Sequence, residues 1–99
     1  MEEISNTNLD NGLFALKFHA DWCAPCKRME PIFSKLEEEF NKIKFISVNT
    51  EENKDILKKY NVRSIPVLIL IKDGVEFNRI NGVTLIDPLR TMFKEFIKE

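Results

Sequence analysis

The strongest constraint on the fold is a strand that leads, within a few residues, into a long amphipathic helix. Residues 13–19 (LFALKFH) alternate between two faces but are mostly apolar, which predicts a strand in the centre of a sheet. Farther along, apolar residues recur at helical spacing and predict a helix over about residues 25–41, with Pro31 inside it. A chain of 99 residues holds one hydrophobic core, so we expect residues 1–99 to form a single domain.

The middle of the chain continues the alternation of strands and helices. Residues 43–48 (IKFISV) and residues 67–71 (VLILI) predict two further buried strands, and a short helix from about residue 53 lies between them. Asp73-Gly74 is a turn dipeptide. We therefore expect residues 75–80 to form a β-hairpin with the strand before the turn.

The C-terminal segment predicts a last helix. Asp87 has the chemistry of an N-cap, and Pro88 suits the first helical position. The predicted order is βαβαββα, with room for a short strand or a helical turn in residues 2–11. Strand–helix–strand units followed by a hairpin predict an α/β fold with a central mixed β-sheet flanked by helices on both faces.

Charge and hydropathy exclude several classes of protein. Fifteen Lys and Arg against sixteen Asp and Glu give a net charge of −1, so nothing draws the chain to nucleic acid. The N-terminus has no basic and apolar signal segment, and the longest apolar run, residues 67–71, is too short to span a membrane. We expect a cytoplasmic protein.

The only two cysteines, Cys23 and Cys26, are separated by two residues. Thiols stay reduced in the cytosol, so a close pair there indicates redox chemistry or metal binding more than a structural disulfide. A closed zinc site needs about four ligands, and the only histidine is His19, so we expect no metal. The remaining alternative is a pair of small buried hydrophobic side chains.

The position of the pair favours redox chemistry. Cys23 lies at the start of the predicted helix, where free N–H groups and the helix dipole stabilise a thiolate. Cys26 is about one turn farther on, so we expect it near Cys23 and more buried. Pro25 restricts the backbone between them. A thiolate at Cys23 could attack a disulfide, and Cys26 could then release the reduced product.

Three segments carry a resemblance to a known family. Residues 20–31 (ADWCAPCKRMEP) resemble the active-site segment of thioredoxins, in which WCGPCK is the commonest form, and Pro31 matches a proline in the family's active-site helix. Residues 62–74 (VRSIPVLILIKDG) resemble the segment with the family's cis-proline, and Asn81-Gly82 resembles its glycine loop. The resemblance runs from about residue 13 to the C-terminus and implies the thioredoxin fold.

The resemblance implies roles for these residues. Cys23 would be the exposed nucleophile and Cys26 the resolving thiol. Pro66 would follow a cis peptide bond, and the backbone of Ile65 would pair with an extended substrate segment. By itself, the sequence leaves Trp22 equally suited to a core or edge position. The implied supporting residues are Trp22, Pro25, Lys17 and Pro66, and the implied substrate-binding residues are Trp22, Ile65, Pro66 and Gly82.

The sequence departs from the family pattern in four places. Ala24 replaces the usual glycine between the cysteines, which leaves the redox potential open. Lys17 stands where the family has a buried aspartate thought to assist proton transfer at the resolving cysteine, and Ser47 stands where that aspartate's lysine partner lies. His19 replaces a bulky aromatic residue, and we expect it to act in packing.

Lys17 has two interpretations. If it is buried, its ammonium group would favour the Cys26 thiolate or, when neutral, would accept a proton during exchange. The alternative is that its aliphatic stem lets the amine reach solvent.

The resemblance implies a thioredoxin-type dithiol–disulfide oxidoreductase that reduces protein disulfides as a monomer. A thioredoxin reductase or a similar donor would reduce it in turn, and no cofactor is needed because the electrons reside on the two sulfurs. A disulfide isomerase or oxidant remains an alternative, and the reduction potential separates these activities. The rival outside catalysis is a binding module that holds a partner protein on the surface of Trp22, Ile65 and Gly82.

Overall fold

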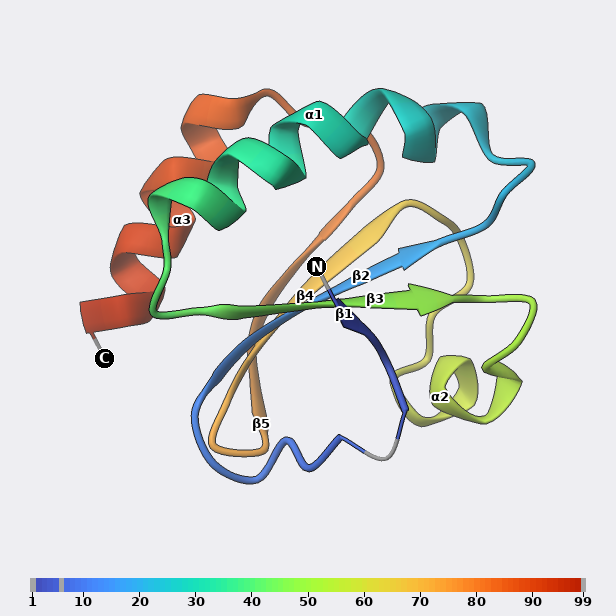
Figure 1. Cartoon of the computed structure of the whole chain (residues 1–99), viewed down its shortest axis with the longest axis horizontal. Coiled ribbons are helices and arrows are strands. Elements are labelled where there is room, and N and C mark those ends of the chain that lie inside the picture. Colours follow the sequence, from blue (N-terminus) through green and yellow to red (C-terminus); the bar gives the residue numbers. More distant parts are fainter. Residues whose placement is uncertain (1, 6, 99) are drawn as a thin grey trace.

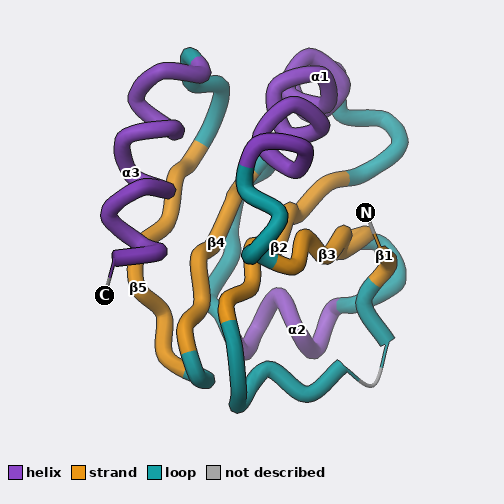
Figure 2. Tube along the Cα trace, turned by 60° about the vertical axis from the view of Figure 1, so that its left-hand side comes forward, coloured by secondary structure: helices purple, strands orange, loops and turns teal. Residues whose placement is uncertain are grey.

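A five-stranded mixed β-sheet separates two layers of helices in the computed structural model, which describes residues 2–5 and 7–98 (Figure 1). In chain order the elements are β1 (Glu2–Glu3), β2 (Leu13–His19), α1 (Ala24–Glu39), β3 (Lys44–Asn49), α2 (Lys54–Lys59), β4 (Val67–Lys72), β5 (Val75–Asn81) and α3 (Ile86–Lys98). Helices α1 and α3 lie side by side on one face of the sheet, and α2 lies on the other (Figure 2).

The strand order is β1-β3-β2-β4-β5. Strand β2 lies in the middle and runs parallel to β3 and antiparallel to β4, while β5 forms a hairpin with β4. The two residues of β1 extend the sheet beyond β3. The carboxyl ends of β2 and β3 lie at the same edge, where α1 begins (Figure 1).

The sheet has one apolar core on each face. Residues of β2 alternate between them, as the sequence predicts: Ala15 faces the layer of α1 and α3, whereas Phe14, Leu16 and Phe18 pack on the side of α2. A strand that is covered on both faces excludes water from its backbone, which explains why residues 14–18 are all buried.

The predicted elements are confirmed with shifts at their ends. Helix α1 begins at Ala24 and ends at Glu39, two residues before the predicted end. Helix α3 begins at Ile86, so Asp87 lies in its first turn and the N-cap prediction for this residue is wrong. Pro88 is tolerated there because the first-turn amides have no partner within the helix. The short element expected in residues 2–11 is the strand β1; residue 6 lies outside the described residues.

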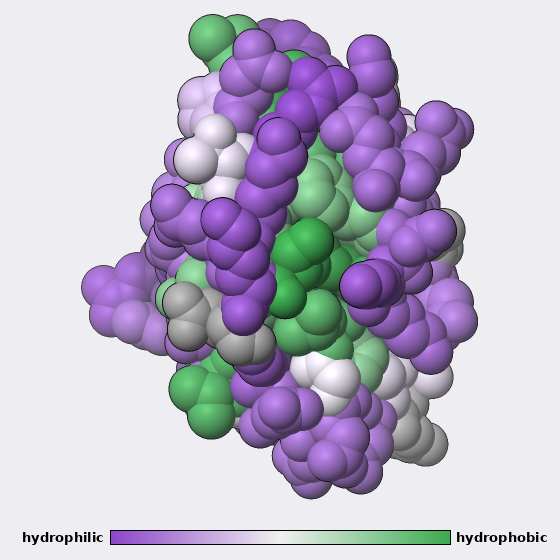
Figure 3. Space-filling view, turned by 90° about the vertical axis from the view of Figure 1, so that its left-hand side faces the viewer, coloured by the Kyte–Doolittle hydropathy of each residue, from purple (hydrophilic) through white to green (hydrophobic). Residues whose placement is uncertain are grey.

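The end of the molecule that is farthest from the start of α1 has a largely hydrophilic surface with apolar side chains between the polar ones (Figure 3). Beneath this region, Phe93 of α3 joins three elements. Its ring centroid lies 5.2 Å from that of Phe40, which caps α1, and 5.8 Å from that of Phe45 in β3. Phe93 is completely buried, so it links both helices to the sheet.

Replacing Phe93 with alanine should lower the free energy of unfolding by about 3 to 5 kcal/mol, because it removes a buried ring and leaves a cavity. Urea denaturation followed by circular dichroism measures the change. Ile97→Ala on the same helix is the matched control: Ile97 is 38% exposed, so its loss should cost about 1 kcal/mol or less. Equal destabilisation by the two variants would contradict the assignment of Phe93 as the link.

Candidate active site

Cys23 and Cys26 are joined by a disulfide bond at the start of α1, with their Cα atoms 5.3 Å apart. Cys23 is the N-cap residue, in extended conformation, and Cys26 lies in the first turn. The Cys26 amide donates a hydrogen bond to Cys23 Sγ at 3.2 Å. The local sequence thus places the sulfur of Cys23, and not that of Cys26, at the positive end of the helix.

The expected difference in burial between the two cysteines is absent from this oxidised form. Each residue is 3% exposed, and both pack with Ala20 and Ile65. The prediction of an exposed Cys23 and a more buried Cys26 is therefore wrong for the disulfide state. The asymmetry of the pair lies in the backbone instead, because only the sulfur of Cys23 accepts a helix amide.

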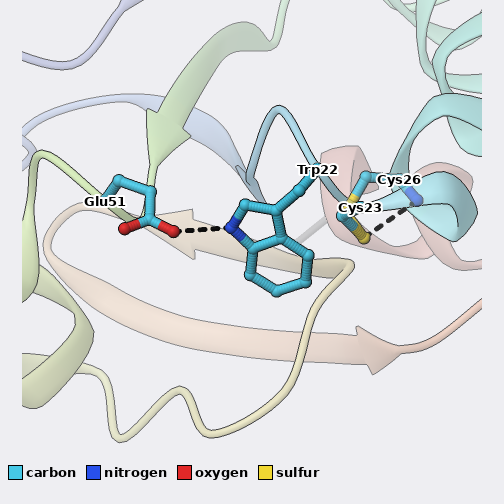
Figure 4. The surroundings of a disulfide bond; sticks show 4 residues. All are labelled: Trp22, Cys23, Cys26 and Glu51. Atoms are coloured by element: carbon cyan, nitrogen blue, oxygen red, sulfur yellow. Dashed lines mark hydrogen bonds between the residues drawn. A yellow bond between two sulfur atoms is a disulfide. The ribbon is translucent and has the colours of Figure 1, made fainter.

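Trp22 lies on the surface and not in the core. It is 70% exposed, and its indole Nε1 donates a 2.5 Å hydrogen bond to a carboxylate oxygen of Glu51, in the turn after β3 (Figure 4). The sequence analysis did not identify Glu51. Acidic residues are common after strands, and only the parallel pairing of β2 with β3 brings this one to the indole.

Pro66 and Gly82 contact each other directly, and Pro66 follows a residue that packs on the cysteines. The Ile65–Pro66 peptide bond is cis, as the resemblance implies, and Ile65 packs against the cysteines. The amide of Gly82 donates to the Pro66 carbonyl at 2.8 Å. Gly82 has a φ of 83°, a conformation that a residue with a side chain rarely adopts, which accounts for glycine at this position.

A surface groove of about 180 Å³ begins at Trp22 and continues along the segment before Pro66. The groove is lined by Trp22, Thr50, Leu57, Val62, Arg63, Ser64 and Ile65.

Two exposed apolar residues that the sequence analysis did not identify follow Gly82 in the chain: Val83 is 53% exposed and Leu85 is 78% exposed.

Pro25 and Ala24 form the segment between the cysteines. Both belong to the first turn of α1, where a proline costs no hydrogen bond. Pro25 therefore sits where it limits the backbone between the two sulfurs without interrupting the helix.

Lys17 is buried beneath α1 and does not extend into bulk solvent, with 8% of the residue exposed. Its Nζ lies 6.0 Å from the ring centroid of Phe33 in α1, within the range of a cation–π contact. Its side chain also lines an open hollow between α1 and the sheet. Of the two interpretations of Lys17, the structure favours the buried one.

His19 does more than pack. Its Nε2 lies 2.6 Å from the hydroxyl oxygen of Ser47 on the neighbouring strand, so the two residues share a hydrogen bond. Burial, and then the positive charge of Lys17, lower the pKa of His19 from its ordinary value of 6.5, against weaker opposing effects of three carboxylates. Both effects favour the neutral form of the imidazole.

Within the described residues, 2–5 and 7–98, no group of three or more His, Cys, Asp and Glu side chains is arranged to hold a metal ion. Across the same part of the chain, no helix combines the length and apolar character needed to cross a bilayer.

The family model and the relatives that match this chain all indicate the same family. Residues 2–95 match the family model described as Thioredoxin. The chain is 38% identical over 84 residues to a thioredoxin of Chlamydia caviae, an alignment that covers 85% of this chain and 82% of that protein. It is 43% identical over 80 residues to the mitochondrial thioredoxin-2 of Schizosaccharomyces pombe, where it covers 79% of this chain and 60% of that protein.

Solved structures agree. The oxidised mitochondrial thioredoxin 3 of Saccharomyces cerevisiae superposes with a TM-score of 0.80 at 31% identity, covering 88% of this chain and 81% of that one. Thioredoxin NaTrxh of Nicotiana alata gives a TM-score of 0.81 at 29% identity, and the superposition covers 87% of this chain and 74% of that one. These matches confirm the thioredoxin fold. With its cysteine pair closed at the start of α1, the chain belongs to the thioredoxin family and is a thioredoxin-type dithiol–disulfide oxidoreductase.

Proposed function

We propose that Cys23 is the nucleophile and Cys26 the resolving thiol in the reduction of protein disulfides. The Cys23 thiolate attacks one sulfur of the substrate disulfide, forms a mixed disulfide and displaces the other substrate sulfur as a thiolate. The Cys26 thiolate then attacks Cys23 Sγ and displaces the second substrate thiolate. The substrate gains two electrons, and Cys23 and Cys26 become the disulfide seen in this structure.

The observation that carries this assignment is the hydrogen bond from the Cys26 amide to Cys23 Sγ. A helix amide directed at one sulfur stabilises negative charge there and makes that thiol the more acidic of the two. The closed disulfide shows that the second sulfur reaches the first, as resolution requires.

The proposed docking surface surrounds the disulfide. Trp22 offers an exposed ring, and Ile65 precedes the cis-proline at the end of the groove. An extended substrate segment would pair with the backbone of Ile65 and lie between Trp22 and the loop at Gly82. We further propose a monomer that acts in a reducing compartment such as the cytosol, where a thioredoxin reductase or a similar donor regenerates the dithiol.

An insulin-reduction assay coupled to a reductase tests the assignment. The wild-type protein should turn over, and Cys26→Ser should lose turnover by about 100-fold or more because the mixed disulfide at Cys23 cannot resolve. Mass spectrometry should find the trapped adduct on Cys23. A wild type that stays inactive with both reductase and glutathione as donors would support the binding module instead.

The role of Trp22 can be tested through Glu51. Glu51→Ala removes the acceptor of the indole hydrogen bond, so KM for insulin should rise about two- to fivefold with little change in kcat, as expected for one exposed hydrogen bond. Glu52→Ala is the matched control, since it removes the adjacent exposed carboxylate but leaves Trp22 in place. If both variants raise KM equally, surface charge and not the position of Trp22 is responsible.

The electrostatic role of Lys17 can be measured in a background in which Cys26 is the only thiol. In Cys23→Ser, the thiolate titration of Cys26 followed by ultraviolet absorbance should move to higher pH by about 1 unit when Lys17 is replaced with methionine, because a nearby positive charge is lost. Lys59→Met, an exposed lysine on α2, is the control. An unchanged titration in Lys17→Met would refute this role.

A further inference from the structure

An open hollow of about 350 Å³ lies between α1 and the edge of the sheet, and the reaction described above makes no use of it. Lys17 and His19 of β2 and Ser47 of β3 line it on the side of the sheet. Glu30 and Ser34 line it on the side of α1. The hollow holds the hydrogen-bonded imidazole of His19, whose pKa is lowered by burial, at a position that the family often fills with a bulky aromatic residue.

The hollow lies in line with Cys26 along α1. Residues 26, 30, 34 and 37 are separated by four, four and three positions, so they follow one another along a single face of the helix. The last three of them line the hollow. On the sheet, His19 ends the strand that leads into the cysteine loop, and the next residue, Ala20, packs against both cysteines.

Resolution of the mixed disulfide needs a proton acceptor at Cys26. A buried thiol attacks only as a thiolate, and burial opposes its ionisation. The residue at the family's usual acidic position is Lys17, which in its charged form has no lone pair to accept a proton. His19, the one histidine of the sequence, lines the hollow from the sheet and carries a basic nitrogen.

We propose that His19 accepts the proton of the Cys26 thiol during resolution, through water that enters this hollow, and that Ser47 orients the imidazole. This inference rests on the proposed role of Cys26 as the resolving thiol. The proposal requires the tautomer in which His19 Nε2–H donates the bond shared with Ser47 Oγ, because this tautomer leaves the lone pair of Nδ1 as the base. The Cys26 S–H bond breaks, the proton passes to Nδ1, and the thiolate forms the Cys23–Cys26 bond as the substrate thiolate leaves. The imidazolium then releases its proton to solvent.

Four charged groups, from β1, β2, the cysteine loop and α1, shift the pKa of His19. Lys17, two residues earlier on the same strand, opposes its protonation, whereas Glu3 of β1, Asp21 of the cysteine loop and Glu30 of α1 favour it. Glu37 also lines the hollow. The balance favours the neutral form, so the acceptor is available at neutral pH and is lost on acidification below the ordinary histidine value of 6.5.

Stopped-flow mixing of the reduced protein with excess dithiobis-nitrobenzoate separates the two steps. The first release of coloured thiolate reports attack by Cys23 and speeds up with reagent concentration, while the second reports attack by Cys26 and is independent of it. His19→Gln should slow the second phase about 10- to 100-fold at neutral pH, the low end of general-base effects, and leave the first within about twofold. The second phase of the wild type should slow on acidification below pH 6.5, and His19→Gln should abolish this pH dependence.

Three further measurements distinguish a proton acceptor from a structural residue. Added imidazole should restore the second phase in His19→Ala, which a packing defect would not allow. Ser47→Ala should give a smaller loss with the pH dependence retained. Glu30→Gln removes the carboxylate on the opposite wall, which also acts on His19, and should slow the second phase far less than His19→Gln does.

A second phase with wild-type rate and pH dependence in His19→Gln would overturn the inference while leaving the role of Cys26 intact. Slowing by Glu30→Gln in place of His19→Gln would overturn it in favour of a carboxylate acceptor. Absence of any second phase in the wild-type protein would instead refute the resolving role of Cys26, and this inference with it.

Discussion

The burial of β2 between β3 and β4 is the constraint on which the other features depend. Every residue from 14 to 18 is covered on both faces of the sheet, so the strand has one register and its carboxyl end has one position. That end delivers Cys23 to the start of α1, where a helix amide meets its sulfur. The redox centre is therefore fixed by packing far from the sulfurs themselves.

The same burial makes Lys17 unusual, because a lysine in the centre of a sheet is costly unless its amine finds a favourable surrounding. Two features of the fold meet this requirement. The ring of Phe33 lies within cation–π range of the amine, and the Lys17 side chain lines an open hollow between α1 and the sheet. Lys17 and His19 thus share one polar surrounding beneath the active-site helix.

The proposed docking surface combines groups from four separate parts of the chain. The loop after β2 supplies Trp22, the turn after β3 supplies Glu51, the segment before β4 supplies Ile65, and the loop after β5 supplies Gly82. Each group is held by a contact with another part: the indole by a carboxylate, Ile65 by the cysteines and Gly82 by the Pro66 carbonyl. The shape of the proposed docking surface therefore depends on these contacts as much as on residue identity.

The sequence by itself determined the features that arise from local periodicity and local chemistry. The alternation of residues 13–19 and the apolar spacing of α1 predict their elements correctly, and a cysteine at a strand-to-helix junction predicts the redox chemistry. Helix ends were less accurate, as at Ile86, because capping competes with tertiary packing. Only the tertiary structure decided the partners of Trp22 and His19 and the burial of Lys17. Glu51 and Ser47 lie 29 and 28 residues from those partners, and no local pattern encodes a contact that forms only when β3 pairs with β2.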